Sequence, residues 1–523
     1  EIAQCLVGSE MCIRDRYYHM VDAYLSYDNT FNHHHIRGLV GFNYEQDYQK
    51  NLYSTMMDIQ SNNLNDFNLG NHTEGVSLEG GQYEWALESF FGRVGYDWKG
   101  RYLAEVNLRW DASSRFRRDK RAAVFPSVSA GWRVSEEPFF APIRNTFSNF
   151  KIRGSFGSLG NQAISSPYPY IQTLDLLQQN YLVNGEFLTY ASVSAPTAGN
   201  FTWETVVHGN LGLDLGFFNN RLTFAGDLYI RDTKDMLVPG KTLPGVYGAA
   251  SPKENAADLR TKGYELTLSW NDKFNLAGKP FTYGVSFALG DNISKITKYD
   301  NPTKDFNVSQ YYEGMTIGEI WGYKIDGLFK TDEEAAAYQA EIDHSLIAKN
   351  ILQTATGKYK GLKAGDPKFV DLDGNGRIDD GEKTANNRGD MRVIGNSRPR
   401  YNYSGSINLG WNGFDISAFF QGVGRQHRYP DGNAMLFWGG YARPYSSFVP
   451  EHFLDDVWSE DNPDAYFPKL RGYAAQGDRH LAKVNNRYLQ NTAYCRLKNL
   501  TVGYTLPVSY THLRAHETLS DLV

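Results

Sequence analysis

Hydrophobic and polar residues alternate along several stretches of this chain, most clearly from Ser89 to Asp111. Successive side chains of a β-strand point to opposite faces, so residues two apart share a face. On this spacing one face is apolar and the other polar. The apolar face carries Phe90, Val94, Tyr96, Tyr102, Val106, Leu108 and Trp110. The pattern predicts an antiparallel hairpin that turns at Trp98-Lys99-Gly100.

The length of this hairpin suits a membrane better than a soluble sheet. Each arm has about ten residues, which is what a tilted strand needs to cross a bilayer. Aromatic residues lie near the ends of the apolar face, where a membrane interface would be. The polar face would then line the lumen of a barrel. The predicted lumen-lining residues are Arg93, Glu105, Asn107 and Arg109.

The same alternation recurs along the chain and predicts an all-β, antiparallel transmembrane barrel with roughly 13 strands present. The clearest further strands are Tyr17 to Tyr27, Ile36 to Tyr44, Pro126 to Ser135, Phe150 to Ser158, Leu211 to Phe217, Leu222 to Arg231, Tyr264 to Trp270, Phe281 to Asn292, Tyr401 to Trp411, Phe414 to Gly422 and Tyr494 to Leu506. The connections between strands largely alternate between short and long. Outer-membrane barrels have this asymmetry, with short periplasmic turns and long extracellular loops. A soluble sandwich has no reason to segregate its long loops to one end.

Composition agrees with a barrel and excludes other classes. The 523 residues are 14% aromatic, yet contain no run of about eighteen apolar residues, so a helical membrane protein is excluded. A net charge of −6 offers no basic patch for nucleic acid. The cysteines Cys5, Cys12 and Cys495 have no metal-binding spacing.

The two ends of the chain share no pattern with its interior. Residues 1–16 and 509–523 resemble translated sequencing-adaptor sequence, so we expect both segments to be non-native and leave them out of the fold prediction. The first also lacks the basic and long apolar regions of a signal peptide. Residues 17–508 remain as the predicted barrel segment.

Several motifs in the interior, in the same order, resemble the SusC/RagA family of TonB-linked outer-membrane receptors. They are RWDASSRF (109–116), FPSVSAGWRVSEEPFF (125–140), KIRGSFGSLGNQ (151–162), NLGLDLGFFNNRL (210–222), IGNSRPRYNYSG (394–405), DVWSEDNPDAYFPKL (456–470) and RYLQNTAYCRLKNLTVGYTLP (487–507). The resemblance implies an importer of large nutrients, foremost glycans and alternatively peptides, and not an enzyme. It also implies a barrel of about 22 strands in the outer membrane of a Gram-negative bacterium.

The partners implied by this resemblance are a SusD-like surface lipoprotein and TonB with ExbB/ExbD, besides outer-membrane lipid. No stretch resembles the family's plug domain or TonB box, which should precede Tyr17, and its last strands should follow Pro507. We therefore expect this chain to be part of a barrel. The alternative is a secreted all-β protein, either a carbohydrate-binding sandwich or a glycoside hydrolase, since acidic pairs are plentiful.

The sharpest local motif is DLDGNGRIDDGE, which begins at Asp371. It fits the twelve-residue calcium loop, with a glycine for the bend at the sixth position and a glutamate at the twelfth. The predicted Ca²⁺ ligands are Asp371, Asp373, Asn375, Arg377 through its carbonyl, Asp379 and Glu382. The alternative is an ion-free turn rich in Asp, Asn and Gly.

Two further features lie in the predicted long loops. Thr331 to Glu334 fits a capping box and predicts one amphipathic helix over EEAAAYQAEIDHSLIAKN, which ends at Asn350. Aromatic residues gather between Gly424 and Asn491, where they could contact a ligand or a lipoprotein lid, or pack the loop onto itself. The candidate ligand-binding residues are Trp438, Tyr441, Tyr445 and Trp458.

Overall fold

The computed structural model describes most of the chain. The described residues are 9–57, 66–70, 76–162, 164, 168–194, 196–197, 199, 201–240, 243–248, 251–307, 309, 311–347, 361–447, 449, 451–477 and 479–506. The C-terminal segment 509–523 and the first eight residues lie outside them. The chain divides into two compact units, one containing residues 1–137, 152–210 and 231–257 and the other containing the remainder.

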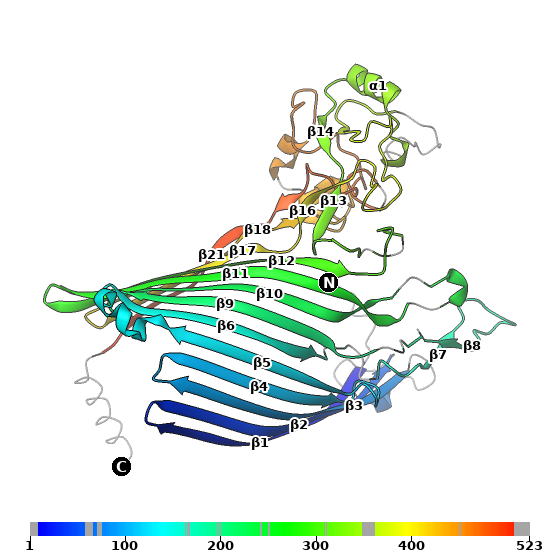
Figure 1. Ribbon diagram of the computed structural model, residues 1–523. Coiled ribbons are helices and arrows are strands. Elements are labelled where there is room, and N and C mark those ends of the chain that lie inside the picture. The colour runs from blue at the N-terminus through cyan, green and yellow to red at the C-terminus, as the bar shows by residue number, and fades with distance from the viewer. Residues whose placement is uncertain are drawn as a thin grey trace, which may run out of the picture. The chain divides into compact units, whose positions relative to one another are not determined.

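One sheet of thirteen strands dominates the described residues, and its strands are ordered as they follow in the sequence (Figure 1). The recorded ladders are antiparallel, from β1 to β5 and from β11 through β12, β17 and β18 to β21. The predicted all-β architecture and its strand number are therefore confirmed. The strands are β1 (Ser9–Phe31), β2 (His34–Met56), β3 (Ser77–Trp98), β4 (Tyr102–Ser113), β5 (Ala122–Arg133), β6 (Phe147–Asn161), β9 (Glu204–Phe217), β10 (Leu222–Pro239), β11 (Lys253–Leu276), β12 (Lys279–Lys298), β17 (Arg400–Trp411), β18 (Phe414–Arg425) and β21 (Tyr494–Tyr504).

The short turns lie where the sequence places them. Asn412 and Gly413 join β17 to β18 with φ of 50° and 89°, the left-handed pair that a tight two-residue hairpin requires. Asn219 and Asn220 likewise have φ of 58° and 61° between β9 and β10. Because neighbouring strands are antiparallel from β1 to β5 and again from β11 to β21, the short turns and the long connections within each of these two sets fall at opposite ends of the strands.

Several strands are much longer than the sequence pattern predicts. β2 has 23 residues, β3 has 22 and β11 has 24, about twice the length that a bilayer requires. In the region between the predicted strands, residues 47–56 belong to β2 and residues 77–88 belong to β3. Beyond the bilayer both faces of a strand meet water, so alternation is no longer needed and the pattern becomes invisible. β1 also begins at Ser9, within the segment predicted to be non-native, and pairs with β2 from Ser9 onward.

The long connections carry small elements that alternation did not predict. Residues 162–203 contain the hairpin β7 (Leu174–Gln178) and β8 (Thr189–Val193). Residues 299–399 contain β13 (Glu319–Gly322), β14 (Ile325–Leu328), α1 (Asp332–Glu341), β15 (Pro367–Phe369) and β16 (Arg392–Asn396). Residues 426–493 contain β19 (His427–Arg428), α3 (Met435–Trp438) and β20 (Gln490–Asn491). Short 3-10 turns are η1 (Phe67–Leu69), η2 (Val134–Glu136), η3 (Pro138–Ile143), η4 (Gly245–Tyr247), η5 (Gly439–Tyr441) and η6 (Glu451–Asp456).

The predicted Thr331 cap is present, with the return bond of Glu334 reaching the Lys330 amide instead of the Thr331 amide, and the helix behind it is shorter than expected. The Thr331 hydroxyl accepts the Glu334 amide at 3.2 Å, and a Glu334 carboxylate oxygen accepts the Lys330 amide at 2.8 Å. α1 ends at Glu341, and residues 348–350 of the predicted helix lie outside the described part. Ala335 is buried and Tyr338 packs against the same cluster with Phe329 and Leu362, so α1 has one narrow packed face and is otherwise mostly exposed. None of the described helices combines the length and the apolar character needed to cross a membrane.

Candidate functional site

The hairpin of β3 and β4 has one polar and one apolar face, as predicted. Arg93 and Asn107 are direct partners in the ladder, so they share a face, and Glu105 and Arg109 follow on that face at spacing two. Glu105 accepts a hydrogen bond from the Asn107 amide group at 3.1 Å. The Arg109 guanidinium donates to Asp111 at 2.7 Å and to the Ser89 hydroxyl at 2.8 Å. The four predicted residues thus share one polar face, on which Glu105, Asn107 and Arg109 make hydrogen bonds, and its role as a lumen wall stays a prediction.

The apolar face of the same hairpin is the more open one. Val94, Val106 and Leu108 expose 60%, 56% and 54% of their surface, whereas the polar residues of β4 between them are only half-exposed. A water-soluble sheet buries its apolar face, because burial of apolar surface drives folding. The arrangement in β4 is the reverse. It suits a wall whose apolar side meets lipid.

Aromatic side chains cross-pair at the short-turn ends of the strands. Tyr102 lies between Trp98 and Trp132, with ring centroids 5.6 and 6.4 Å away. In the second unit, Phe414 and Tyr504 pair at the corresponding turn end of β18, with centroids 4.5 Å apart. Aromatic rings with an apolar body and a polar edge concentrate at membrane interfaces. These pairs agree with the predicted aromatic belt.

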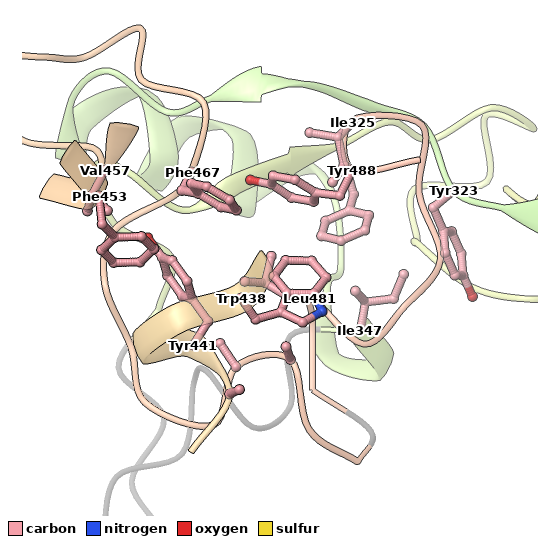
Figure 2. Close-up of a cluster of buried hydrophobic side chains, with 14 of the residues drawn as sticks. Tyr323, Ile325, Ile347, Trp438, Tyr441, Phe453, Val457, Phe467, Leu481 and Tyr488 are labelled. Atoms are coloured by element: carbon pink, nitrogen blue, oxygen red, sulfur yellow. The ribbon is translucent and has the colours of Figure 1, made fainter. Parts of the chain in front are cut away.

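The two longest connections fold into one body, which we call the loop lobe and define as the described residues of 299–399 and 426–493. Figure 2 shows its core, to which both connections contribute. Phe467 stacks on Tyr488 with centroids 5.8 Å apart and on Tyr441 with centroids 5.6 Å apart. Tyr323 and Ile325, from the first connection, belong to the same cluster. The core is therefore shared between the two connections.

Three of the four candidate ligand-binding aromatics belong to this lobe's interior. Tyr441 is fully buried, Trp438 is 1% exposed, and Trp458 is 8% exposed in a smaller cluster with Leu328. A covered ring cannot stack on a ligand, so the prediction is wrong for these three residues. The alternative, that the aromatic residues pack the loop onto itself, accounts for them. Tyr445 is 79% exposed and stays a candidate.

A buried ion pair, which sequence reasoning missed, also joins the two connections. Asp366 is 1% exposed and accepts hydrogen bonds from the Arg471 guanidinium at 2.9, 3.0 and 3.1 Å. The amide of Lys363 donates to the same carboxylate at 3.0 Å. These residues are 105 positions apart in the sequence, and no local pattern links them. The ion pair ties the segment around Asp366 to the segment around Arg471.

The predicted calcium loop forms a tight turn within the lobe. Asp371 accepts the amides of Gly374 and Gly376 at 2.7 and 2.8 Å, and Gly376 has the positive φ, 78°, that the bend requires. Burial acts to raise the pKa of Asp371, but these amide hydrogen bonds outweigh it and lower the pKa. Asn375 accepts the Arg377 amide, and Asp379 accepts the Gly381 amide, each at 2.8 Å.

A third carboxylate joins Asp371 and Asp373, and the motif does not contain it. One oxygen each of Asp371, Asp373 and Asp390 lies within 4.8 Å of the others. Asp390 is buried, and its oxygens accept the amides of Leu372 at 2.6 Å and Asp379 at 2.9 Å. Burial raises the pKa of Asp390, and the two neighbouring carboxylates add to this effect.

Of the four carboxylates among the six predicted ligands, the structure groups Asp371 and Asp373. Asp379 and Glu382 are outside the three-carboxylate group, and Glu382 is exposed. Asn375 and Arg377 lie in the intervening turn. Calcium binding stays a prediction, with Asp390 as a candidate ligand that could not be found from motif spacing.

Comparison with known proteins identifies relatives for nearly the whole chain. The family model described as TonB dependent receptor-like, beta-barrel matches residues 9–341. TonB-dependent receptor P3 of Formosa agariphila is 29% identical over 506 residues, covering 93% of this chain and 45% of the relative. TonB-dependent receptor SusC of Bacteroides thetaiotaomicron is 28% identical over 429 residues, covering 80% of this chain and 38% of the relative. The chain thus spans less than half the length of these relatives.

Solved structures show the same fold. The RagAB peptide transporter matches with a TM-score of 0.71 and 20% identity, over 97% of this chain and 51% of that one. The RagAB peptide importer in its open-open state matches with a TM-score of 0.70 and 21% identity, over 97% of this chain and 49% of that one. The similarity extends through the sheet and the loop lobe, since nearly all of this chain is covered.

Proposed function

Because this chain belongs to the TonB-dependent receptor β-barrel family of the Gram-negative outer membrane, we propose that it forms part of the wall and the outer loops of a nutrient importer. The family comprises receptors and transporters, not enzymes, which argues against the hydrolase alternative. The cargo that we propose is a large glycan or oligosaccharide, with a peptide as the second candidate. The peptide candidate draws on the fold that this chain shares with the RagAB peptide transporter.

The observation that carries this proposal is the sidedness of the β3–β4 hairpin. Its apolar residues lie on the open face and its hydrogen-bonded polar residues on the other, which is the arrangement of a lipid-facing wall around a polar lumen. A secreted lectin or hydrolase would gain nothing from exposing Val94, Val106 and Leu108 to water. A membrane importer requires it.

We propose that transport depends on gating and not on covalent chemistry. Ligand captured on the extracellular side would signal through a plug domain to TonB, which ExbB/ExbD energise from the inner membrane. A SusD-like lipoprotein would cover the external side. The loop lobe suits such a role because its aromatic core and the Asp366–Arg471 pair give it a fixed shape on which a lid could close.

The proposal can be tested in the native bacterium with the full-length gene. A deletion strain and its complemented counterpart are supplied with a fluorescent oligosaccharide or a fluorescent peptide of similar mass, and uptake is measured. We expect uptake of one probe to be lost on deletion, restored by the gene, and lost again without tonB. Uptake that persists without tonB, or a protein recovered soluble from the medium, would overturn the proposal. Co-purification of a surface lipoprotein tests the proposed lid.

A further inference from the structure

A second row of aromatic side chains crosses β2, β3 and β4, away from the short turns. Phe42, Phe90 and Trp110 are successive partners in the ladders, with ring centroids 5.0 and 5.8 Å apart. Along β4, Trp110 is eight residues from Tyr102 of the first aromatic row. This is about 26 Å of strand, or about 20 Å along the membrane normal at a tilt of about 40°. Since a barrel wall has an apolar band about 25 Å tall between two aromatic girdles, the row at Trp110 marks the outer edge of the band.

An apolar groove of about 870 Å³ lies on the lipid-facing side of these strands. Two glycines, Gly38 and Gly92, leave open space within it. The nearest atom outside the adjoining residues would be 3.9 Å from a Cβ placed on Gly38 and 3.7 Å from one placed on Gly92. Phe90, Trp110 and Val124 line the groove at its outer edge. A hydrocarbon chain fits such a groove, because the groove is lined by apolar side chains and opens toward lipid.

The connection from β4 to β5 lies just beyond the groove and is strongly basic. Its residues 115–121, RFRRDKR, are called the basic turn below. Trp110 and Val124 of the groove are partners in the β4–β5 ladder, and Val124 is three residues from Arg121, or about 10 Å of strand. The headgroup layer of a bilayer begins at the edge of the hydrocarbon core and is several ångströms deep. The basic turn is therefore at the level of the lipid headgroups.

Positive charge predominates on the exposed surface of the basic turn. Arg117, Arg118 and Lys120 are exposed, and Asp119 pairs with Arg117 at 3.3 Å. Among the residues that the structure describes, neither Arg118 nor Lys120 has a carboxylate partner. Glu88 on β3 is a second carboxylate near this level, and it forms no ion pair with the basic turn, all of which is described. Together with Arg121, the turn has four cationic side chains near two carboxylates, so its charge complements an anion.

The basic turn is held in place by a small core of its own. Phe116 is fully buried against Phe125, Phe201 and Trp203. The Arg121 guanidinium donates to the Phe116 carbonyl at 3.1 Å, and the Trp203 indole donates to the Arg121 carbonyl at 2.9 Å. Cations on a fixed turn lose less conformational freedom on binding than cations on a mobile loop. The turn therefore presents its charges in a preorganised arrangement.

We propose that the groove and the basic turn together bind one membrane lipid with a phosphate-bearing headgroup. An acyl chain lies over Gly38 and Gly92, and the headgroup phosphate pairs with Arg118 and Lys120. Basic clusters beside a membrane-spanning segment attract anionic lipids in this way. A neutral lipid can fill the groove, but only an anionic headgroup engages both the groove and the turn. The site is on the lipid side of the wall and is independent of the nutrient that the receptor imports.

The test is native mass spectrometry of the full-length receptor in a neutral detergent. The probes are lipid A with two phosphates, the same lipid with one phosphate, and phosphatidylcholine, whose headgroup has no net charge. Because the two forms of lipid A share their acyl chains, the difference between their affinities reports the charge alone. We expect the lipid with two phosphates to bind at least about tenfold more tightly than phosphatidylcholine, and this preference to fall with added salt. Equal affinities for the three lipids would indicate bulk lipid contact only and would overturn the proposal.

The double variant Arg118→Gln, Lys120→Gln tests the headgroup contact. Its affinity for lipid A with two phosphates should fall about tenfold, and its affinity for phosphatidylcholine should not change. Both side chains are exposed, so heat-modifiable migration on SDS gels should stay normal. The matched control is Lys99→Asn, Arg133→Gln, which removes two exposed cations at the opposite ends of the strands and should bind as the wild type does. Wild-type affinity in the first variant, or an equal loss in the control, would refute the headgroup contact.

The variant Gly92→Leu tests the groove. The open space above Gly92 accepts the new side chain, and leucine suits a lipid-facing position, so the receptor should fold normally. Its affinity for both forms of lipid A should fall several-fold because the leucine occupies the place of the acyl chain. Unchanged affinity in this variant would refute the acyl-chain contact. Displacement of the lipid by a large excess of inorganic phosphate would identify a site for the free anion and overturn the lipid assignment.

Discussion

Replacing Trp438 by alanine is expected to open the loop lobe without affecting the sheet. The indole is 1% exposed and packs against Tyr429, Phe437, Phe467 and Tyr488. Burying a tryptophan removes about 200 Å² from water, worth about 5 kcal/mol at 25 cal/mol per Å². Alanine retains a small part of this.

The variant also loses a hydrogen bond. The Trp438 indole nitrogen donates to the Asp431 carbonyl at 3.0 Å, and such a bond contributes about 1 kcal/mol. The two losses, reduced by partial collapse of the cavity, give a cost of about 4 kcal/mol to the stability of the lobe. At 1.4 kcal/mol per factor of ten, protection against amide exchange should fall by roughly three orders of magnitude.

The assay is hydrogen exchange of the full-length receptor read by mass spectrometry. Because the aromatic core is shared, peptides around Tyr323 in the first connection should lose protection together with peptides around Tyr488 in the second. Tyr445→Ala is the matched control, since that ring is 79% exposed and its loss should leave exchange unchanged. Faster exchange confined to the second connection would refute the shared core. Unchanged exchange combined with lost ligand binding would restore Trp438 as a binding residue.

Three further predictions follow from the same structure. Val106→Arg places a charge on the predicted lipid face and should lower the stability of the folded receptor by about 2–4 kcal/mol. The measurement is heat-modifiable migration on SDS gels, which this variant should lose. The receptor with Asn107→Arg, on the opposite face, should migrate as the wild type does. Calcium should raise the midpoint of lobe unfolding in the wild type and not in Asp371→Ala or Asp390→Ala, and an equal shift in all three would exclude this site. Burial lowers the pKa of His480 to about 3, so as the pH falls the imidazole is protonated in the unfolded chain before it is protonated in the folded one. The stability that this residue contributes is therefore complete above about pH 6.5 and is lost between about pH 6.5 and about pH 3. His480→Gln should flatten that part of the pH profile of lobe exchange.

The sequence predicts the sheet because the membrane imposes a rule on each strand separately. Within the bilayer one face of each strand must be apolar. Alternation alone therefore locates a strand such as β4 and shows which of its residues share the apolar face. Turn chemistry is local too, and Asn412-Gly413 adopts the conformation that its residues favour. The rule stops at the membrane surface, which is why parts of β2, β3 and β11 lie outside the strands that the sequence predicts.

The lobe could not be predicted in this way, because its stability comes from contacts between two distant connections. The sequence shows that Trp438, Tyr441 and Trp458 are aromatic residues in a long loop, but whether they face a ligand or a core depends on what the other connection supplies. The same holds for Asp390, which reaches the calcium motif only because the chain folds back on it. Local physical rules determined the strands and turns, and only the tertiary structure decided which side chains of the long connections are buried and which can reach a ligand.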